Sequence, residues 1–161
     1  SSRLETGILS LHPEPGPLSP TVERAAAQYL SKAQAKQIRL SVGQMRGSAL
    51  FDPKWTEEAL CNLLDNAVKY TPAGGRVSVE IRPYEMFTAV CVQDTGPGIP
   101  EAEQAKIFGR FYRAPSAYQT EGVGIGLYLT RQIAAGQGGY IKVESSPGAG
   151  SIFSLYLPRE S

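Results

Sequence analysis

Two pairs of short segments with alternating apolar residues limit the folds open to this chain. Segments 76–83 and 86–94 form one pair, and segments 140–145 and 151–157 form the other. Neither connection within a pair is long enough for a crossover, so each pair must be an antiparallel hairpin. Helical patterns alternate with these strands along the chain. The sequence therefore predicts an α/β fold with a mixed sheet and helices on one face, rather than a doubly wound parallel sheet.

Helical and strand periodicity also places the remaining elements. We expect helices at 21–36, 53–70 and 125–136, and one further strand at 38–42. Ser19 or Thr21 could cap the first helix. Asp52 precedes Pro53, as an N-cap residue precedes a proline at the first helical position.

The beginning of the chain differs in composition from the rest. Residues 1–20 are rich in proline, which is typical of a connector. We expect residues 1–35 to be a linker with the end of a preceding helical region, and residues 36–161 to form one domain. The sequence starts without methionine and shows no signal-peptide pattern, so we expect it to be part of a longer protein.

Composition argues against several classes of function. The formal net charge of +1 offers no field that would favour nucleic acid or an anionic membrane. No apolar run approaches the ~20 residues of a membrane span. Cys61 and Cys91 lie inside helical and strand patterns and are expected to be buried free thiols. The single histidine, His12, lies among prolines and is expected to be an ordinary loop residue, so a zinc site has little support.

One face of the helix at 53–70 carries groups that suit a nucleotide and a metal ion. At ~100° per residue, Asn62, Asn66 and Lys69 fall within an arc of ~60°. An amide oxygen can bind Mg²⁺, and a lysine can meet a phosphate as a point charge. Asn62 cannot accept a proton as a carboxylate does, so it cannot be a general base for water. The pattern predicts ATP binding with slow hydrolysis, which favours phosphoryl transfer to a positioned acceptor.

Two glycine clusters follow. Asp94 ends an apolar strand before a glycine turn, where its carboxylate could accept a hydrogen bond from adenine or simply cap the turn. The cluster at 122–126 opens a helix, where backbone amides could bind phosphate, although a plain flexible loop remains the alternative. Its spacing is not that of a dinucleotide fold, and the sequence has no P-loop.

The segment between these clusters is about 30 residues long, and loops of that length are usually functional lids or disordered. Within it, residues 107–113 combine aromatic side chains with two arginines. Arginine suits the charge of a transferring phosphate, and exposed aromatic residues suggest a contact surface. Packing of the aromatic residues back onto the core would account well for Phe108 but less well for Arg110 and Arg113.

Four segments in this order resemble the catalytic, ATP-binding domain of bacterial sensor histidine kinases, of the ATPase superfamily shared with gyrase and Hsp90. Residues 62–70 match the N box, 94–98 the G1 box, 107–113 the F box and 122–127 the G2 box. The resemblance covers about residues 36–158 and implies a two-layer α/β sandwich of the Bergerat type, with ATP between the helices and a mobile lid.

The resemblance also implies roles for individual residues. Asn66 would hold Mg²⁺, Asp94 would read the adenine amine, and the catalytic residues would be Asn62, Lys69 and Arg113. The ATP contacts would come from Asn62, Asn66, Lys69, Tyr70, Asp94, Gly96, Gly98, Ile99, Phe108, Gly122, Val123, Gly124, Ile125, Gly126 and Leu127. Val123 stands where the family usually has threonine, and Gly109 where it often has an acidic residue.

The phosphoacceptor histidine of the family lies in an H box on a dimerisation helix, and nothing in this chain matches it. The resemblance therefore implies the catalytic part of a sensor kinase that phosphorylates a histidine on a dimerisation domain outside this chain. A response regulator would be the downstream partner. The full-length protein would be a homodimer at the membrane, with this domain in the cytoplasm. An anti-sigma-type serine kinase and a non-enzymatic ATP-sensing module of the same fold are the alternatives.

Overall fold

The computed structural model describes residues 9–109 and 123–159. Its elements, in chain order, are β1 (Glu14–Pro17), α2 (Ser19–Ala27), α3 (Leu30–Ala35), β2 (Arg39–Val42), β3 (Ser48–Phe51), α4 (Pro53–Tyr70), β4 (Arg76–Pro83), β5 (Phe87–Asp94), α5 (Glu101–Gln104), α6 (Val123–Gly136), β6 (Tyr140–Ser145) and β7 (Ser151–Pro158). Within these residues, no helix is both long and apolar enough to cross a membrane.

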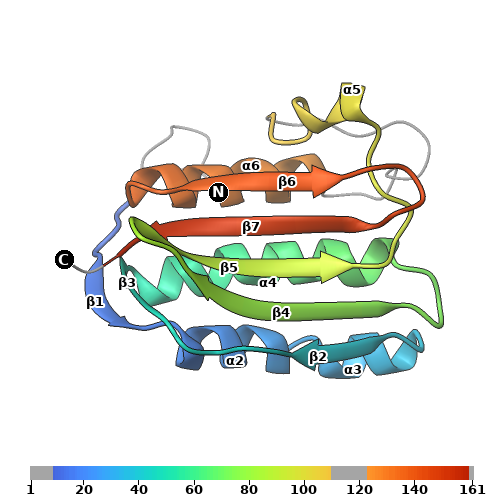
Figure 1. The fold of residues 1–161 in the computed structure, drawn as a ribbon, viewed down its shortest axis with the longest axis horizontal. Coiled ribbons are helices and arrows are strands. Elements are labelled where there is room, and N and C mark those ends of the chain that lie inside the picture. Colours follow the sequence, from blue (N-terminus) through green and yellow to red (C-terminus); the bar gives the residue numbers. More distant parts are fainter. Residues whose placement is uncertain (1–8, 110–122, 160–161) are drawn as a thin grey trace.

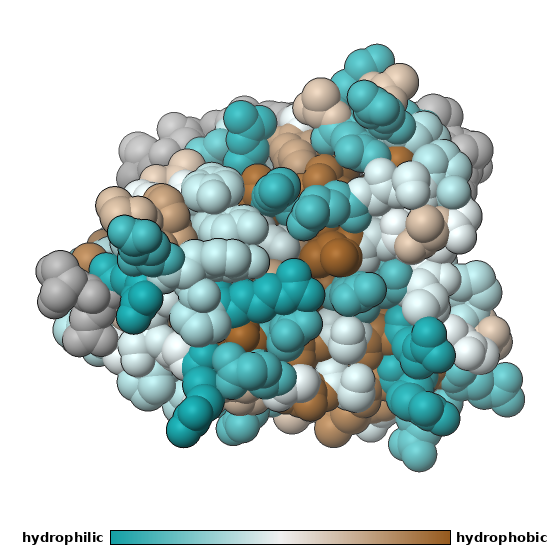
Figure 2. Space-filling view, viewed as in Figure 1, coloured by the Kyte–Doolittle hydropathy of each residue, from teal (hydrophilic) through white to brown (hydrophobic). Residues whose placement is uncertain are grey.

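The main sheet has five strands in the order β2-β4-β5-β7-β6, and β2 pairs with β4 in parallel while the other pairs are antiparallel. Helices α2, α3, α4 and α6 lie on one face of this sheet (Figure 1). This arrangement confirms the predicted mixed sheet with helices on one face. The open face, seen in Figure 2, is largely hydrophilic because outward residues of the strands, such as Arg76, Ser78 and Glu80, alternate with buried ones.

The core lies between the helices and the sheet. Leu60, Leu63 and Leu64 of α4 are buried against Val77, Val79 and other apolar side chains of the strands. Because the apolar face of α4 packs on the sheet, the opposite, polar face of this helix points away from the sheet.

The predicted cap of α4 is confirmed, and it also anchors the N-terminal segment. The side chain of Asp52 accepts a hydrogen bond from the backbone N–H of Trp55 at 3.1 Å. The same carboxylate accepts the N–H of His12 at 2.8 Å. The amide of Gln137 then joins this end of α4 to the end of α6, because its oxygen accepts the N–H of Asp52.

Residues 14–35 differ from the expected connector. Glu14–Pro17 forms β1, which pairs with β3 in a separate two-stranded sheet, and Leu18 and Val22 are buried in the common core. Pro15 and Pro17 are two residues apart on this edge strand, so their backbone nitrogens face the same side. The ladder with β3 does not require an N–H group from either of them. The expected boundary near residue 35 therefore does not coincide with a break in packing.

The single helix expected over 21–36 is also wrong. The helix tightens at Gln28 and Tyr29, whose N–H groups reach the carbonyls of Ala25 and Ala26, three residues back. Such i→i+3 bonds end an α-helix, and α3 begins after them. Neither Ser19 nor Thr21 caps α2, because its N-cap residue is Leu18.

Both cysteines are free thiols, as expected, with Cys91 buried and Cys61 half-buried. Burial raises the pKa of Cys61 to about 11 and also raises the pKa of Cys91. Both thiols are therefore protonated near neutral pH and are poor nucleophiles.

Candidate functional site

The polar face of α4 carries the amide and lysine side chains that the sequence placed together. Asn62, Asn66 and Lys69 are not among the buried residues of this helix, which include Leu63. The Nδ2 atom of Asn66 is buried and has no hydrogen-bond partner among the described residues. Leaving a buried polar group unsatisfied costs about 1–3 kcal/mol, so this amide is suited to a ligand from outside the chain.

Lys69 has a carboxylate neighbour that the sequence analysis did not include. Its Nζ lies 3.3 Å from Oδ2 of Asp65, one helical turn earlier. Lys32 of α3 approaches the other oxygen of Asp65 at 3.9 Å. Ion pairs this exposed contribute about 0–1 kcal/mol, so a phosphate could compete for Lys69. The i,i+4 spacing of Asp65 and Lys69 was the available signal for this pair.

A second lysine fixes the end of α4. Nζ of Lys36 donates to the carbonyl of Val68 at 2.8 Å and also to the carbonyl of Lys69. These carbonyls belong to the last turn, which has no intrahelical donors for them, and a cation there also interacts favourably with the helix dipole. Lys36 thereby holds the segment from which Lys69 and Tyr70 project.

Asp94 fills one of the two roles that the sequence left open. The carboxylate is 8% exposed at the end of β5, and its Oδ1 accepts the N–H of Gly96 at 2.8 Å. Asp94 therefore does cap the turn. Burial raises the pKa of this carboxyl above its ordinary value, while hydrogen bonds from the backbone of Gly96 and Ser151 lower it.

Gly96 brings the turn after β5 (residues 94–99, the 94–99 turn) against the end of α4. A Cβ at this position would lie 2.9 Å from Oδ1 of Asp94 and 3.3 Å from the backbone oxygen of Tyr70. The hydroxyl of Thr71 is 3.6 Å from the same point, is buried, and has no hydrogen-bond partner among the described residues. The two predicted motifs therefore meet here, and Thr71 is a candidate site residue that sequence reasoning missed.

The far end of the 94–99 turn is clasped to the sheet. The N–H of Ile99 donates to Oγ of Ser145 at 2.8 Å. The side-chain amide of Gln104 donates to the carbonyls of both Ile99 and Ser145, each at 2.8 Å. At Gly98, φ is +78°, and a Cβ would lie 2.0 Å from the carbonyl oxygen of Ser146, so no other residue fits there.

We expect Gln104→Ala to loosen this clasp, because both carbonyls lose their donor. The free energy of local opening at Ile99 should fall by about 1–2 kcal/mol, the net value of two ordinary hydrogen bonds. Amide exchange of Ile99 measures this opening. Gln104→Glu keeps the size of the side chain but removes its hydrogen-bond donors, so it should speed exchange at Ile99 as Gln104→Ala does. Exchange at the wild-type rate in Gln104→Glu would show that the amide does not hold the turn.

Comparison with known proteins identifies the arrangement. Residues 51–161 match the family model described as histidine kinase-, DNA gyrase B-, and HSP90-like ATPase. The chain belongs to this ATPase family. The match extends from the last residue of β3 to the end of the chain, and so includes both sides of the candidate site.

Relatives and solved structures similar to this ATPase domain include histidine kinases. Adaptive-response sensory kinase SasA of Synechococcus sp. (strain JA-2-3B'a(2-13)) is 49% identical over 108 residues, which are 66% of this chain and 29% of that protein. Circadian input-output histidine kinase CikA of Synechococcus elongatus is 33% identical over 99% of this chain and 22% of its own length. The chain thus spans less than a third of either relative.

Solved structures agree with this assignment. Mycobacterial sensor histidine kinase MprB superposes with a TM-score of 0.81 at 28% identity, covering 92% of this chain and all (100%) of that one. Full-length ShkA, in complex with AMPPNP, gives a TM-score of 0.83 at 28% identity, covering 98% of this chain and 33% of that one. The chain is thus an ATP-binding catalytic domain of the histidine kinase type.

Other predicted residues of this ATPase domain lie further along the chain. Phe108 is buried, and its ring meets that of Phe153 edge to face with 6.3 Å between the ring centroids. This contact confirms that Phe108 packs back onto the core. Helix α6 begins at Val123, two residues earlier than expected, so the backbone of Val123, Gly124, Ile125 and Gly126 forms its first turn. Leu127 is buried. Arg110, Arg113 and Gly122 lie outside the described residues.

Proposed function

We propose that this chain binds Mg²⁺ and ATP between α4 and the 94–99 turn, and transfers the γ-phosphoryl group to a histidine on a dimerisation domain outside the chain. The observation that carries the proposal is the meeting of these two elements at Gly96. It places the buried carboxylate of Asp94 beside the end of the helix that presents Asn62, Asn66 and Lys69. In this proposal Asp94 reads the adenine amine, and Lys69 and the backbone at the start of α6 bind phosphates.

The chemistry of Asn66 fits a magnesium ion. Its buried atom without a partner among the described residues is Nδ2, a hydrogen-bond donor that suits a phosphate oxygen, and its amide oxygen is a ligand of the kind that Mg²⁺ accepts. The described residues contain no group of three or more His, Cys, Asp or Glu side chains arranged for a metal ion. Mg²⁺ is commonly bound through one or two protein oxygens together with substrate phosphates, and Asn66 would be such a ligand. The ion would supply neutralisation of phosphate charge.

Transfer rather than hydrolysis follows from the residue at position 62. The Asn62 amide can orient a group by hydrogen bonding but cannot take a proton from water. The proposed catalytic contributions of the chain are therefore positioning by Asn62 and charge stabilisation by Lys69 and Arg113.

The acceptor must come from elsewhere, because His12 is held at the wrong end of α4. Its backbone N–H donates to Asp52, at the N-cap of α4. Asn66 is 14 residues further along α4 and hence about 20 Å away. The proposed partners are accordingly a dimerisation domain carrying the phosphoacceptor histidine and a response regulator. The whole protein would be a homodimeric membrane sensor with this domain in the cytoplasm.

Labelled ATP tests the proposal. Incubated alone with Mg²⁺ and γ-labelled ATP, the chain should bind nucleotide, hydrolyse it very slowly and acquire no acid-labile phosphohistidine. With the cognate dimerisation domain, label should appear on the histidine of that domain. Arg113→Ala should slow transfer more than it weakens ATP binding, as expected for an interaction strongest in the transition state.

Four other results would contradict the proposed function. Acid-stable phosphoserine on a partner would favour the serine kinase, and ATP binding with no transfer to any supplied domain would favour the sensing module. Rapid labelling of His12 in the chain alone, or fast ATP turnover that persists in Asn62→Ala, would overturn the mechanism.

A further inference from the structure

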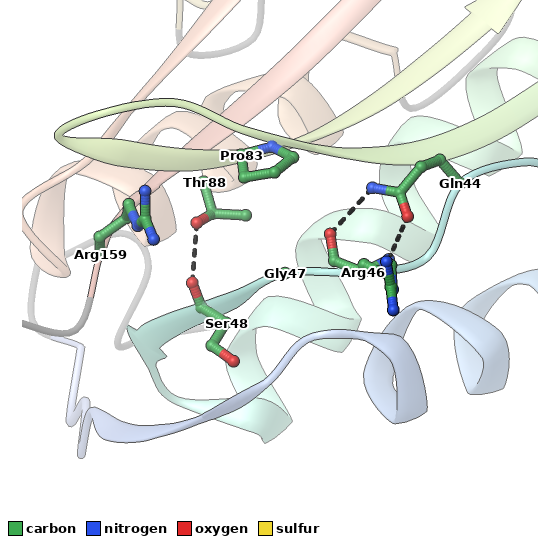
Figure 3. A pocket seen from close by; sticks show the side chains of 7 residues that line it. All are labelled: Gln44, Arg46, Gly47, Ser48, Pro83, Thr88 and Arg159. Atoms are coloured by element: carbon green, nitrogen blue, oxygen red, sulfur yellow. Dashed lines mark hydrogen bonds between the residues drawn. The ribbon is translucent and has the colours of Figure 1, made fainter.

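A second candidate site lies at the opposite end of the sheet from Asp94. It is a cavity of about 850 Å³ lined by Gln44, Arg46, Gly47, Ser48, Pro83, Thr88 and Arg159, called the arginine cavity below (Figure 3). Thr88 and Asp94 are six residues apart on β5, which corresponds to about 20 Å along a strand. The cavity is therefore separate from the proposed ATP site.

The segment that carries Arg46 is rigidly held. The amide of Gln44 donates to the carbonyls of Arg46 and Ile81, each at 3.0 Å, and its oxygen accepts the N–H of Arg46 at 2.7 Å. On the other side, the hydroxyl of Thr88 donates to the carbonyl of Ser48 at 2.7 Å. These bonds fix the backbone on both sides of Arg46 without using its guanidinium group.

Arg159 is anchored by the β4–β5 hairpin. Its backbone N–H donates to the carbonyl of Met86 at 3.2 Å, and its side-chain Nη1 donates to the carbonyl of Tyr84 at 2.8 Å. A guanidinium group has five N–H bonds, and within the part of the chain that the structure describes only Nη1 of the Arg159 guanidinium forms a hydrogen bond. Figure 3 shows Arg159 and Arg46 on opposite sides of the view, with Ser48 and Thr88 between them.

The arginine cavity carries positive charge. Among the described residues, its lining contains two arginines and no acidic residue. Neither Arg46 nor Arg159 forms an ion pair with a carboxylate of the described residues. By contrast, Arg24 and Arg82 meet glutamates at 2.8 and 2.9 Å. Two guanidinium groups, that of Arg159 anchored and that of Arg46 on a fixed backbone, suit carboxylates, which they can bind through paired hydrogen bonds.

We infer that the arginine cavity docks an acidic segment of a partner polypeptide, with one carboxylate meeting Arg46 and another meeting Arg159. Both arginines are exposed, so the cavity is open, whereas sites for small molecules usually bury most of the ligand. A polypeptide that remains partly in solvent fits such an opening, and arginine is enriched at protein interfaces. This inference does not depend on the ATP site.

The test uses the whole chain and a hexapeptide, Glu-Glu-Gly-Gly-Glu-Glu, with Gln-Gln-Gly-Gly-Gln-Gln as the matched neutral control. We expect the acidic peptide alone to shift the backbone amide NMR signals of Gly47, Ser48 and Thr88. Arg46→Ala and Arg159→Ala should each raise its Kd by about two- to fivefold, the scale of one exposed ion pair. Arg39→Ala, an exposed arginine at the other end of β2, should leave the Kd unchanged.

The competing results are distinct. Binding should persist when Mg²⁺ and ATP saturate the chain and should weaken with added salt. Absence of shifts at the arginine cavity, or equal binding of the glutamine peptide, would overturn the inference. If citrate displaces the acidic peptide at equal or lower concentration, the cavity is a site for small anions and the assignment to a polypeptide is wrong.

Discussion

Replacing Asn66 by leucine is expected to weaken Mg²⁺-dependent ATP binding by about tenfold to hundredfold, the scale on which lost metal-site partners act. The substitution removes the one amide oxygen proposed to bind the ion. Calorimetry with Mg²⁺ and with EDTA separates the metal-dependent part of the affinity. Asn66→Asp keeps an oxygen ligand and should retain part of the binding.

The same variant carries its own folding control. Asn66 has a buried polar atom without a partner among the described residues, so replacing it by an apolar side chain of similar size should not lower the melting temperature. Loss of ATP binding in a folded Asn66→Leu protein would therefore reflect the site. Unchanged Mg²⁺ dependence in that variant would remove Asn66 from the metal site.

Asp94→Asn is expected to reduce ATP affinity by about 1–3 kcal/mol, the cost of a mismatched buried hydrogen bond. In the proposed site the carboxylate would accept from the adenine amine, whereas the asparagine amide would present a donor on one side. GTP carries a carbonyl at the corresponding position, so the wild type should prefer ATP by a similar margin and the variant should not. Equal wild-type affinities for ATP and GTP would exclude this role for Asp94.

The raised pKa of Asp94 predicts a pH dependence with a definite sign. A carboxyl with a higher pKa in the folded than in the unfolded chain binds more protons when folded, so its contribution to stability falls as pH rises through that interval. The free energy of unfolding of the wild type minus that of Asp94→Asn should therefore decrease from about pH 4, near the ordinary pKa of aspartate, towards neutrality. Urea unfolding over this range measures the difference, and an increase would contradict the burial argument.

Local patterns accounted for most of the fold. The period of α4 and its Asp52–Pro53 start predicted a helix at 53–70, as the structure has it, and the short connections predicted both hairpins. Strands β1 and β3 were missed because their pairing is a contact between distant segments, and β1 contains two prolines. The break at Tyr29 was missed because the residues on either side of it are good helix formers.

The candidate site was predictable only on its helical side. The common face of Asn62, Asn66 and Lys69 follows from helical period alone. The hydrogen bonds from Lys36 to the end of α4 and from Gln104 to Ser145 depend on tertiary packing. No spacing in the sequence indicates such contacts. The assigned roles of the site residues in binding and transfer stay predictions.

Amide hydrogen exchange with and without Mg²⁺ and ATP tests the central claim most directly, because it reports where on the chain the nucleotide binds. The proposed site predicts slower exchange in the 94–99 turn and at the start of α6, with no change at residues 44–48 or 83–88. ATP is itself an anion, so the arginine cavity is the natural competing location. Protection confined to Gly47, Ser48 and Thr88, with none in the 94–99 turn, would contradict the proposed ATP site.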